Sequence, residues 1–305
     1  MTTEWDGQGL PPAAMARMER GRSSSVNSSL LSVPGHVGVE ACGFSVVGEV
    51  MGCIVESIGF IGWAGCGYGG YGVGPAGMLL SSGAATRTVT SAQSNRMVGF
   101  APYVDALYRG FDTAMHRMLL ECQSLGGDGV VGVSLEQRHL GETNSEFVAL
   151  GTAVRACGGQ RPARLFSTTL NGQDFAKLIQ GGWMPASVAI GISMAVRHDD
   201  WATRNQAHAF TYNTEVSGYT QLVNHVRAGA RAELARRVAA IGAEGAITSS
   251  MDLRVRAQEM GENHTDHVAE SKVTGDAVVR FRTGEKAPPK SLMILPLSNP
   301  QGSKR

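Results

Sequence analysis

The chain has 305 residues, and its 27 Lys and Arg residues nearly balance 26 Asp and Glu residues, for a formal charge of +1. This balance, together with the lack of a basic stripe carrying interleaved aromatic residues, argues against a nucleic-acid-binding protein. The length and an apolar fraction of 43% favour two globular domains. The 5 cysteines are an odd number without a CxxC pair, which is typical of reduced thiols, so we expect a cytoplasmic protein.

The first elements are expected to be extended. Residues 1–25 are polar and contain Pro11 and Pro12, which predicts a disordered leader and not a signal peptide. A short strand is expected at residues 28–31, broken at Pro34, and a longer extended segment at residues 37–55. The core of that segment, residues 44–52, contains glycines, which predict a bulge or a close backbone approach.

An insertion rich in glycine follows at about residues 57–100. Its first part, residues 57–85, carries no charge and contains Trp63, Tyr68 and Tyr71. Three interpretations compete: a loop that packs at a subunit interface, a loop that gates a ligand, and a membrane segment. A membrane span needs about 20 mainly apolar residues. Glycine occupies many of those places here, so we favour the interface loop and do not expect membrane insertion.

A helix and a strand come next and organise this half of the chain. Apolar residues at three- and four-residue spacing from Val104 to Leu125 predict an amphipathic helix, which Gly126 ends. Strands are expected at residues 130–136, where valines are concentrated, and at residues 146–155.

The same order of elements then repeats. A helix is expected at residues 220–241, and strands at 246–256 and 267–281. The offset between copies is 139 residues at the first strand, 116 at the helix and 124 at the last strand. A repeat of this length is typical of a duplicated domain. We therefore expect domains at residues 26–157 and 164–282, followed by a Pro-containing tail at 283–305 in which Leu292-Met-Ile-Leu295 is a candidate docking segment.

Three segments resemble the YbjQ-like family, often labelled as heavy-metal-binding: Val47-Gly-Glu-Val-Met-Gly52, Leu125-Gly-Gly-Asp-Gly-Val-Val-Gly-Val133 and Leu150-Gly-Thr-Ala-Val154. The resemblance covers residues 26–156 and, with more differences, 165–282. It implies an α+β fold of two tandem domains, each a small antiparallel sheet packed on one long helix. It also implies assembly into a ring-shaped homo-oligomer, typically a pentamer.

The family label suggests a divalent or soft metal as ligand, and soft metals need thiolates or imidazoles that converge on one point. The metal candidates are Cys42 and Cys53 in the first copy, and the close pair His264 and His267 in a hairpin loop of the second. No Cys or His position repeats between the copies, as the ligands of a duplicated metal site should. Buried thiols and a polar loop are the simpler interpretation.

Two carboxylates are candidate ligand-binding residues. Glu49 lies in an otherwise uncharged stretch, where it is either a ligand or a carboxylate bonded to backbone amides, and Asp128 lies between glycines in a turn. The second copy has Val188 in place of Glu49 and Glu244 in place of Asp128. His116, beside the apolar helix face, is interpreted as a structural residue.

No Ser-His-Asp or phosphate-loop pattern is present, so we do not expect an enzyme. The sequence favours a protein that assembles with its own copies or binds a small ligand. Soft-metal binding through thiols of the first domain is the alternative.

Overall fold

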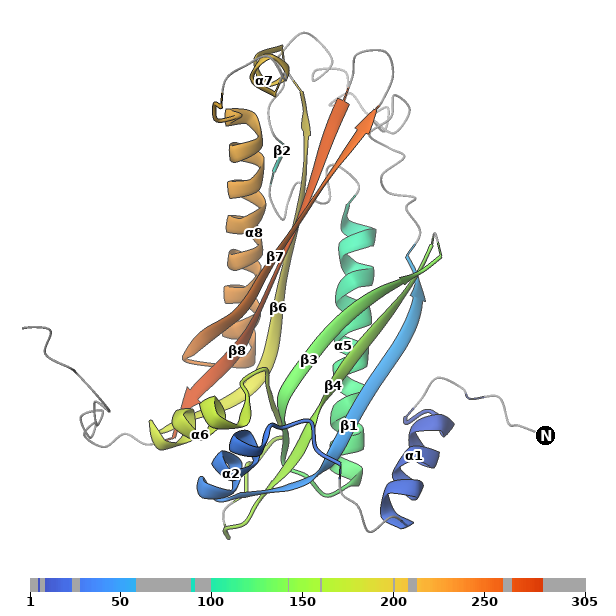
Figure 1. Ribbon diagram of the computed structural model, residues 1–305, viewed down its shortest axis with the longest axis vertical. Coiled ribbons are helices and arrows are strands. Elements are labelled where there is room, and N and C mark those ends of the chain that lie inside the picture. The colour runs from blue at the N-terminus through green and yellow to red at the C-terminus, as the bar shows by residue number, and fades with distance from the viewer. Residues whose placement is uncertain are drawn as a thin grey trace, which may run out of the picture.

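The computed structural model describes residue 5 and residues 9–23, 28–58, 89–90, 100–141, 143–159, 161–199, 201–207, 213–259 and 265–281. These residues form two units of sheet and helix, so the fold is α+β (Figure 1). Most of the glycine-rich insertion, the tail with Leu292–Leu295, Cys66 and His264 lie outside the described residues. No helix in the described ranges is both long and apolar enough to cross a membrane.

The first unit is one long helix and a three-stranded sheet, to whose edge β5 (Phe166–Thr168) of the second unit adds a fourth strand. The strands of this sheet lie in the order β1-β4-β3-β5, and all pairs are antiparallel except the parallel pair of β3 and β5. The elements of the first unit are β1 (Phe44–Ser57), α5 (Ala101–Ser124), β3 (Gly129–Leu140) and β4 (Asn144–Ala156).

The second unit repeats this arrangement. Its sheet has the order β6-β8-β7, and the two-residue strand β2 (Val89–Thr90) adds to the outer edge of β6. The elements are β6 (Trp183–His198), α7 (Trp201–Ala207), α8 (Ser217–Ile241), β7 (Gly245–Glu259) and β8 (Thr265–Arg280). The two long helices and both hairpins predicted from the sequence are confirmed, with strands that extend a few residues further.

Glycines let each sheet approach its helix closely. A methyl group on Gly52 of β1 would overlap the backbone oxygen of Ala114 in α5, and one on Gly191 of β6 would overlap the backbone oxygen of Ala230 in α8. Gly48 lies at a register shift between β1 and β4. The bulge and the close approach predicted for this glycine-rich strand are both present.

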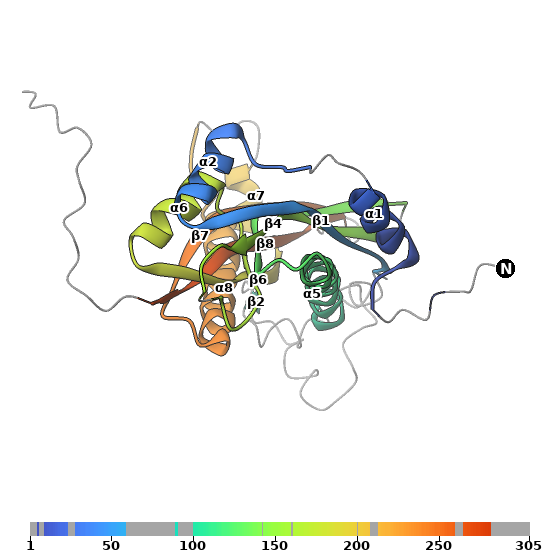
Figure 2. The ribbon, with the colours of Figure 1, turned by 90° about the horizontal axis from the view of Figure 1, so that it is seen from below.

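The two units share one of the buried hydrophobic clusters. Helix α5 lies in the angle between the two sheets, and α8 covers the opposite face of the second sheet (Figure 2). Alternate residues of β6 therefore face α5, and they belong to the same buried cluster as Leu107 and Phe111 of that helix. These β6 residues are Val188, Ile190, Ile192, Met194 and Val196.

The N-terminal segment differs from the sequence predictions at several points. Part of the expected leader forms a helix, α1 (Pro12–Ser23), from which Arg17 donates hydrogen bonds to the buried carboxylate of Glu121 and to the backbone oxygen of Met51. The expected extended segment from residue 37 begins as part of a second helix, α2 (Val33–Ala41).

The start of α2 also explains why Pro34 lies inside a regular element instead of ending one. Ser32 caps the helix by accepting a hydrogen bond from the Gly35 N–H, and proline is tolerated in the first turn of a helix. The second unit has a matching helix, α6 (Gly172–Gln180), capped by Asn171. Residues 28–31, predicted as a strand, have no strand partner within the described chain.

Candidate functional site

The surface where the two units meet is the candidate functional site, and we call it the inter-unit interface. At its lower end, β5 pairs with β3 of the first unit, with Phe166 opposite Gly129 and Thr168 opposite Val131. Along its length, α5 packs against β6. All three residues of β5 are buried.

Side chains of α5 bond directly to the second unit. The Ile192 N–H donates to the Tyr108 hydroxyl oxygen at 2.8 Å, which satisfies a backbone donor on the outer side of β6. The guanidinium of Arg237 stacks on the Tyr108 ring at 4.0 Å and donates two hydrogen bonds to Asp112 at 2.9 and 3.1 Å. Burial raises the pKa of Tyr108, so this residue stays a neutral phenol that can serve as both donor and acceptor.

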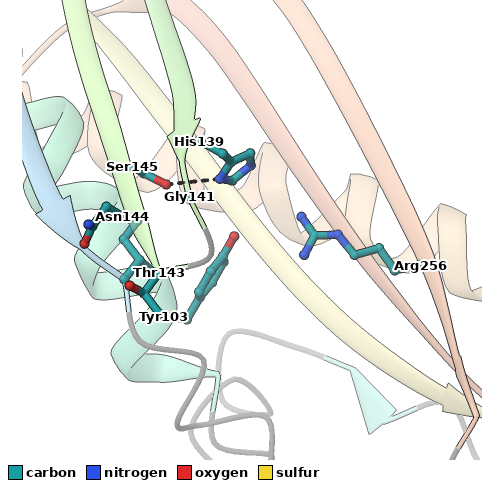
Figure 3. Close-up of a pocket in the computed structure, with 8 residues that line it drawn as sticks. Tyr103, His139, Gly141, Thr143, Asn144, Ser145 and Arg256 are labelled. Carbon is teal, nitrogen blue, oxygen red and sulfur yellow. Dashed lines mark hydrogen bonds between the residues drawn. The ribbon is translucent and has the colours of Figure 1, made fainter.

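A pocket of about 220 Å³ opens where the first hairpin faces the second sheet. Its polar lining comes from both units: Tyr103 at the start of α5, His139 at the end of β3, Ser145 at the start of β4 and Arg256 on β7 (Figure 3). Figure 3 shows the Arg256 side chain reaching toward the Tyr103 ring from the opposite wall. The pocket exists only because the two units are packed together.

The charges around this pocket are partly compensated. His139 Nδ1 lies 3.2 Å from the Ser145 hydroxyl, and its Nε2 lies 3.4 Å from Arg254. The Tyr103 hydroxyl donates to Glu270 at 3.2 Å, and burial and this carboxylate raise the pKa of Tyr103. Arginine and neutral hydroxyl groups are suited to a small polar or anionic ligand.

The two predicted carboxylates are not brought together. Glu49 lies opposite Thr152 on one side of β4, whereas Asp128 lies on the other side. Asp128 is buried, accepts from the Ala156 N–H at 2.8 Å and pairs with Arg161 at 2.7 Å. Its counterpart Glu244 accepts from the Arg280 N–H at 3.0 Å. Both units therefore use this carboxylate to hold the end of a strand.

The candidate thiols are separated as well. Cys42 precedes β1, and Cys53 lies nine residues after Phe44, the first residue of that strand, so about 3.3 Å per residue places Cys53 roughly 30 Å from the start of β1. Cys42 donates to the Val39 oxygen at 3.2 Å. Cys122 is buried, and burial raises its pKa to about 12. Within the described residues, no three Cys, His, Asp or Glu side chains form a group that could hold a metal ion, and Cys42 and Cys53 belong to no such group there.

His267 has a different setting from the one predicted. Its Nδ1 lies 3.1 Å from Asp199, its ring contacts Tyr219 at 4.4 Å, and the Tyr219 hydroxyl donates to Asp199 at 2.9 Å. Burial and the carboxylate raise the pKa of Tyr219 to about 12. This cluster joins the end of β6 to the starts of α8 and β8, a structural connection.

Comparison with known proteins places the chain in a family. Residues 77–157 match the family model described as "Putative heavy-metal-binding" (YbjQ). The chain is also 31% identical over 205 residues to the Encapsulin nanocompartment protein Rv1762c of Mycobacterium tuberculosis, a match that covers 64% of this chain and 74% of that protein. The chain belongs to the YbjQ-like family.

Two archaeal relatives match a shorter part of this YbjQ-like chain. UPF0145 proteins of Halorubrum lacusprofundi and Natronomonas pharaonis are 36% and 40% identical over 53 residues. Each match covers 17% of the chain and 51% of the relative, so the chain spans about half of their length. No solved structure matches the chain significantly.

Sequence reasoning missed the residues of the inter-unit interface. Tyr103 and Tyr108 look like ordinary members of an amphipathic helix, and their partners Glu270 and Ile192 lie more than 80 residues away. The aromatic character of these helix positions was the one available signal, because tyrosine buries a ring while keeping a hydroxyl that needs a partner.

Proposed function

We propose that this YbjQ-like chain is a non-enzymatic assembly protein, which forms a closed homo-oligomeric ring in which first and second units alternate. The finer domain limits, residues 26–157 and 164–282, are part of this proposal. So is a cytoplasmic location, which the free thiols of Cys42, Cys53, Cys122 and Cys157 support.

The observation that carries the proposal is the asymmetry of the inter-unit interface. The first unit offers the edge of β3, and the second unit inserts β5 there. The reverse contact does not occur within the described chain, so the interface joins two different surfaces. Such head-to-tail contacts leave one unused surface at each end, and repetition of them produces rings when the rotation closes.

The name of one relative supports an assembly role. The name of the Mycobacterium tuberculosis protein refers to an encapsulin nanocompartment, and that protein matches 64% of this chain. The resemblance to the YbjQ-like family points to rings as well.

Native mass spectrometry of the untagged protein tests the proposal. We expect one closed species whose mass is a whole multiple of 32.1 kDa, independent of protein concentration over a wide range. A stable species of 32.1 kDa, or a continuous series of filaments, would contradict a ring.

A second candidate function is binding of a small polar or anionic ligand in the pocket of about 220 Å³, which Arg256 and Tyr103 favour. The Arg256→Gln variant should then lose a stoichiometric adduct that the wild type carries in native mass spectra. Soft-metal binding through Cys42 and Cys53 remains the further alternative, although their separation gives it less support. A Cys42→Ser, Cys53→Ser double variant that loses metal uptake would restore it.

A further inference from the structure

The first unit contains a counterpart of β5 that has no strand partner among the described residues. Thr169, which follows β5, donates its N–H to the Asp276 carboxylate on β8 at 2.6 Å. Leu30, 139 residues earlier, donates its N–H to the Thr152 hydroxyl at the equivalent position of β4, at 3.0 Å. Because the same anchor occurs in both units, Ser28 and Ser29 are the counterparts of Ser167 and Thr168.

The strand edge of β7, the counterpart of the edge that receives β5, also carries no added strand in the described part of the chain. Val130 and Val131 of β3, which pair with β5, are fully buried. Of their counterparts on β7, Ala246 is exposed and Ile247 is half-buried. In the described chain, β7 has only β8 as a strand neighbour. Ser28 is likewise exposed, while its counterpart Ser167 is buried.

The helices beside these strands show the same difference. In α6, Gly172 and Ala176 are buried, and Gly172 packs against the backbone of Gly35 in α2. Their counterparts in α2 are Val33 and Val37, which are 80% and 58% exposed. Apolar side chains exposed at these two positions mark a surface that a neighbour covers in the second unit.

We propose that the strand edge at Ala246 and Ile247 receives the segment around Ser28 and Ser29 of a second copy of this chain, in parallel register. This proposal rests on the proposed ring and specifies its contact. The neighbour's Val33 and Val37 then pack beside α6. This is the relation already present between the two units of one chain, with the donor supplied by the next chain.

The helix contact between chains is wider than the one within a chain. Within a chain, glycines at positions 35 and 172 permit backbone contact. Between chains, Val33 of the donor chain takes the place of Gly172. It would face Asp174 and Lys177 of the receiving chain, which stand at the positions of Gly35 and Gly38. The helices cannot approach as closely there, so backbone pairing of strands is the main source of specificity.

The hydrogen bonds between β3 and β5 show which backbone N–H groups a proline substitution should remove to test the proposed contact at β7. Phe166 donates its N–H to the Asp128 oxygen, and the parallel register then directs the N–H and C=O of Val130 toward β5. The counterpart groups of Ala246 therefore face the open edge of β7. Proline at an outward-facing edge position leaves the pairing with the inner strand intact.

Ala246→Pro should convert the ring to the 32.1 kDa monomer in native mass spectra. The matched control is Ala246→Val, which keeps the N–H, installs the residue found at position 130 and should retain the ring. On the donor side, Ser29→Pro should give the same loss. Its control, Ser29→Ala, removes only the hydroxyl that bonds the Leu31 N–H and should also retain the ring.

Mixing the two monomeric variants provides the decisive measurement. Each retains one intact surface, so an equimolar mixture of Ala246→Pro and Ser29→Pro should form a 1:1 dimer and no ring. If both proline variants fold and still form the ring of the wild type, the proposed contact is wrong and the proposed ring is not contradicted. A monomeric wild type overturns both, and if Ala246→Pro does not fold, Ser29→Pro alone decides.

Discussion

Gly52 and Gly191 set how closely each sheet approaches its long helix. Because a side chain at Gly52 would meet the backbone of α5 and not a flexible side chain, the strand or the helix would have to move. We expect Gly52→Ala to lower the free energy of unfolding by about 3 kcal/mol, the upper part of the range for overpacked cores. Urea unfolding followed by circular dichroism measures the change.

The matched control for Gly52→Ala is Gly48→Ala on the same strand. A methyl group there meets only the Leu125 side chain at 3.8 Å, an ordinary contact. It should change stability much less. Equal effects of the two substitutions would mean that the close approach of strand and helix does not limit packing.

Asp276 links stability to pH in an unusual direction. Its side chain is fully buried, and burial raises its pKa above the ordinary value of 3.8 although Thr169 donates two hydrogen bonds to it. A carboxyl group whose pKa is raised on folding contributes most below its unfolded pKa, and this contribution decreases as pH rises through the folded pKa. Relative to the wild type, Asp276→Asn should therefore gain stability as pH rises from below 3.8 to neutral.

Urea midpoints of both proteins across that pH range test this prediction. Asp174→Asn is the contrasting control, since a hydrogen bond from Lys177 lowers the pKa of Asp174. This variant should lose stability relative to the wild type over the same rise in pH, by a small amount because the pair is exposed. A flat difference between Asp276→Asn and wild type would show that Asp276 ionises normally.

At the scale of elements, helix α1 is held by one buried charge. Glu121 is 1% exposed and accepts hydrogen bonds from the Met51 N–H at 2.7 Å and from Arg17 at 2.6 Å. Because β1 is an edge strand, this carboxylate also satisfies a backbone donor that has no strand partner. We expect Arg17→Ala to destabilise the protein by about 1–3 kcal/mol and to release α1.

Amide hydrogen exchange measures the release of α1 directly. Protection of the α1 amides should fall in Arg17→Ala, while Arg20→Ala, an exposed residue of the same helix, should leave it unchanged. If both variants keep the same protection in α1, the Arg17–Glu121 pair does not anchor this helix.

The sequence predicted the long elements because their patterns are long and repeated. Helices α5 and α8 and both hairpins have clear periodicity, and their repetition supported each assignment. Helices α2 and α6 were missed because each has 9 residues, and α2 contains two glycines and a proline. Their caps, Ser32 and Asn171, were the available signal.

The inter-unit pocket could not be predicted from sequence. Its lining joins residues from α5, the first hairpin and β7, which no local pattern connects. Glu49 and Asp128 are isolated acids in glycine-rich sequence, which is why the sequence made them candidates. In the structure, the Asp128 carboxylate accepts a hydrogen bond from the Ala156 N–H at the end of a strand.

At the scale of the whole molecule, α5 belongs to both units. One face packs on the first sheet, and another packs on β6 in a single buried cluster. The units therefore resemble neighbouring subunits of an assembly fused into one chain. A substitution that removes packing between α5 and β6 should therefore destabilise both units.

Ile192 tests this coupling, since it is fully buried in the shared cluster and its N–H bonds to Tyr108 of α5. Ile192→Ala should lower the free energy of unfolding by about 2–5 kcal/mol, through lost burial and a residual cavity. Because the core is shared, amide protection should decrease in α5 of the first unit as much as in β8 of the second. Val255→Ala, at an exposed position of the second unit, should change neither. A decrease confined to β6, β7 and β8 would mean that the units unfold independently, and the chain would then be two tethered domains instead of one cooperative building block.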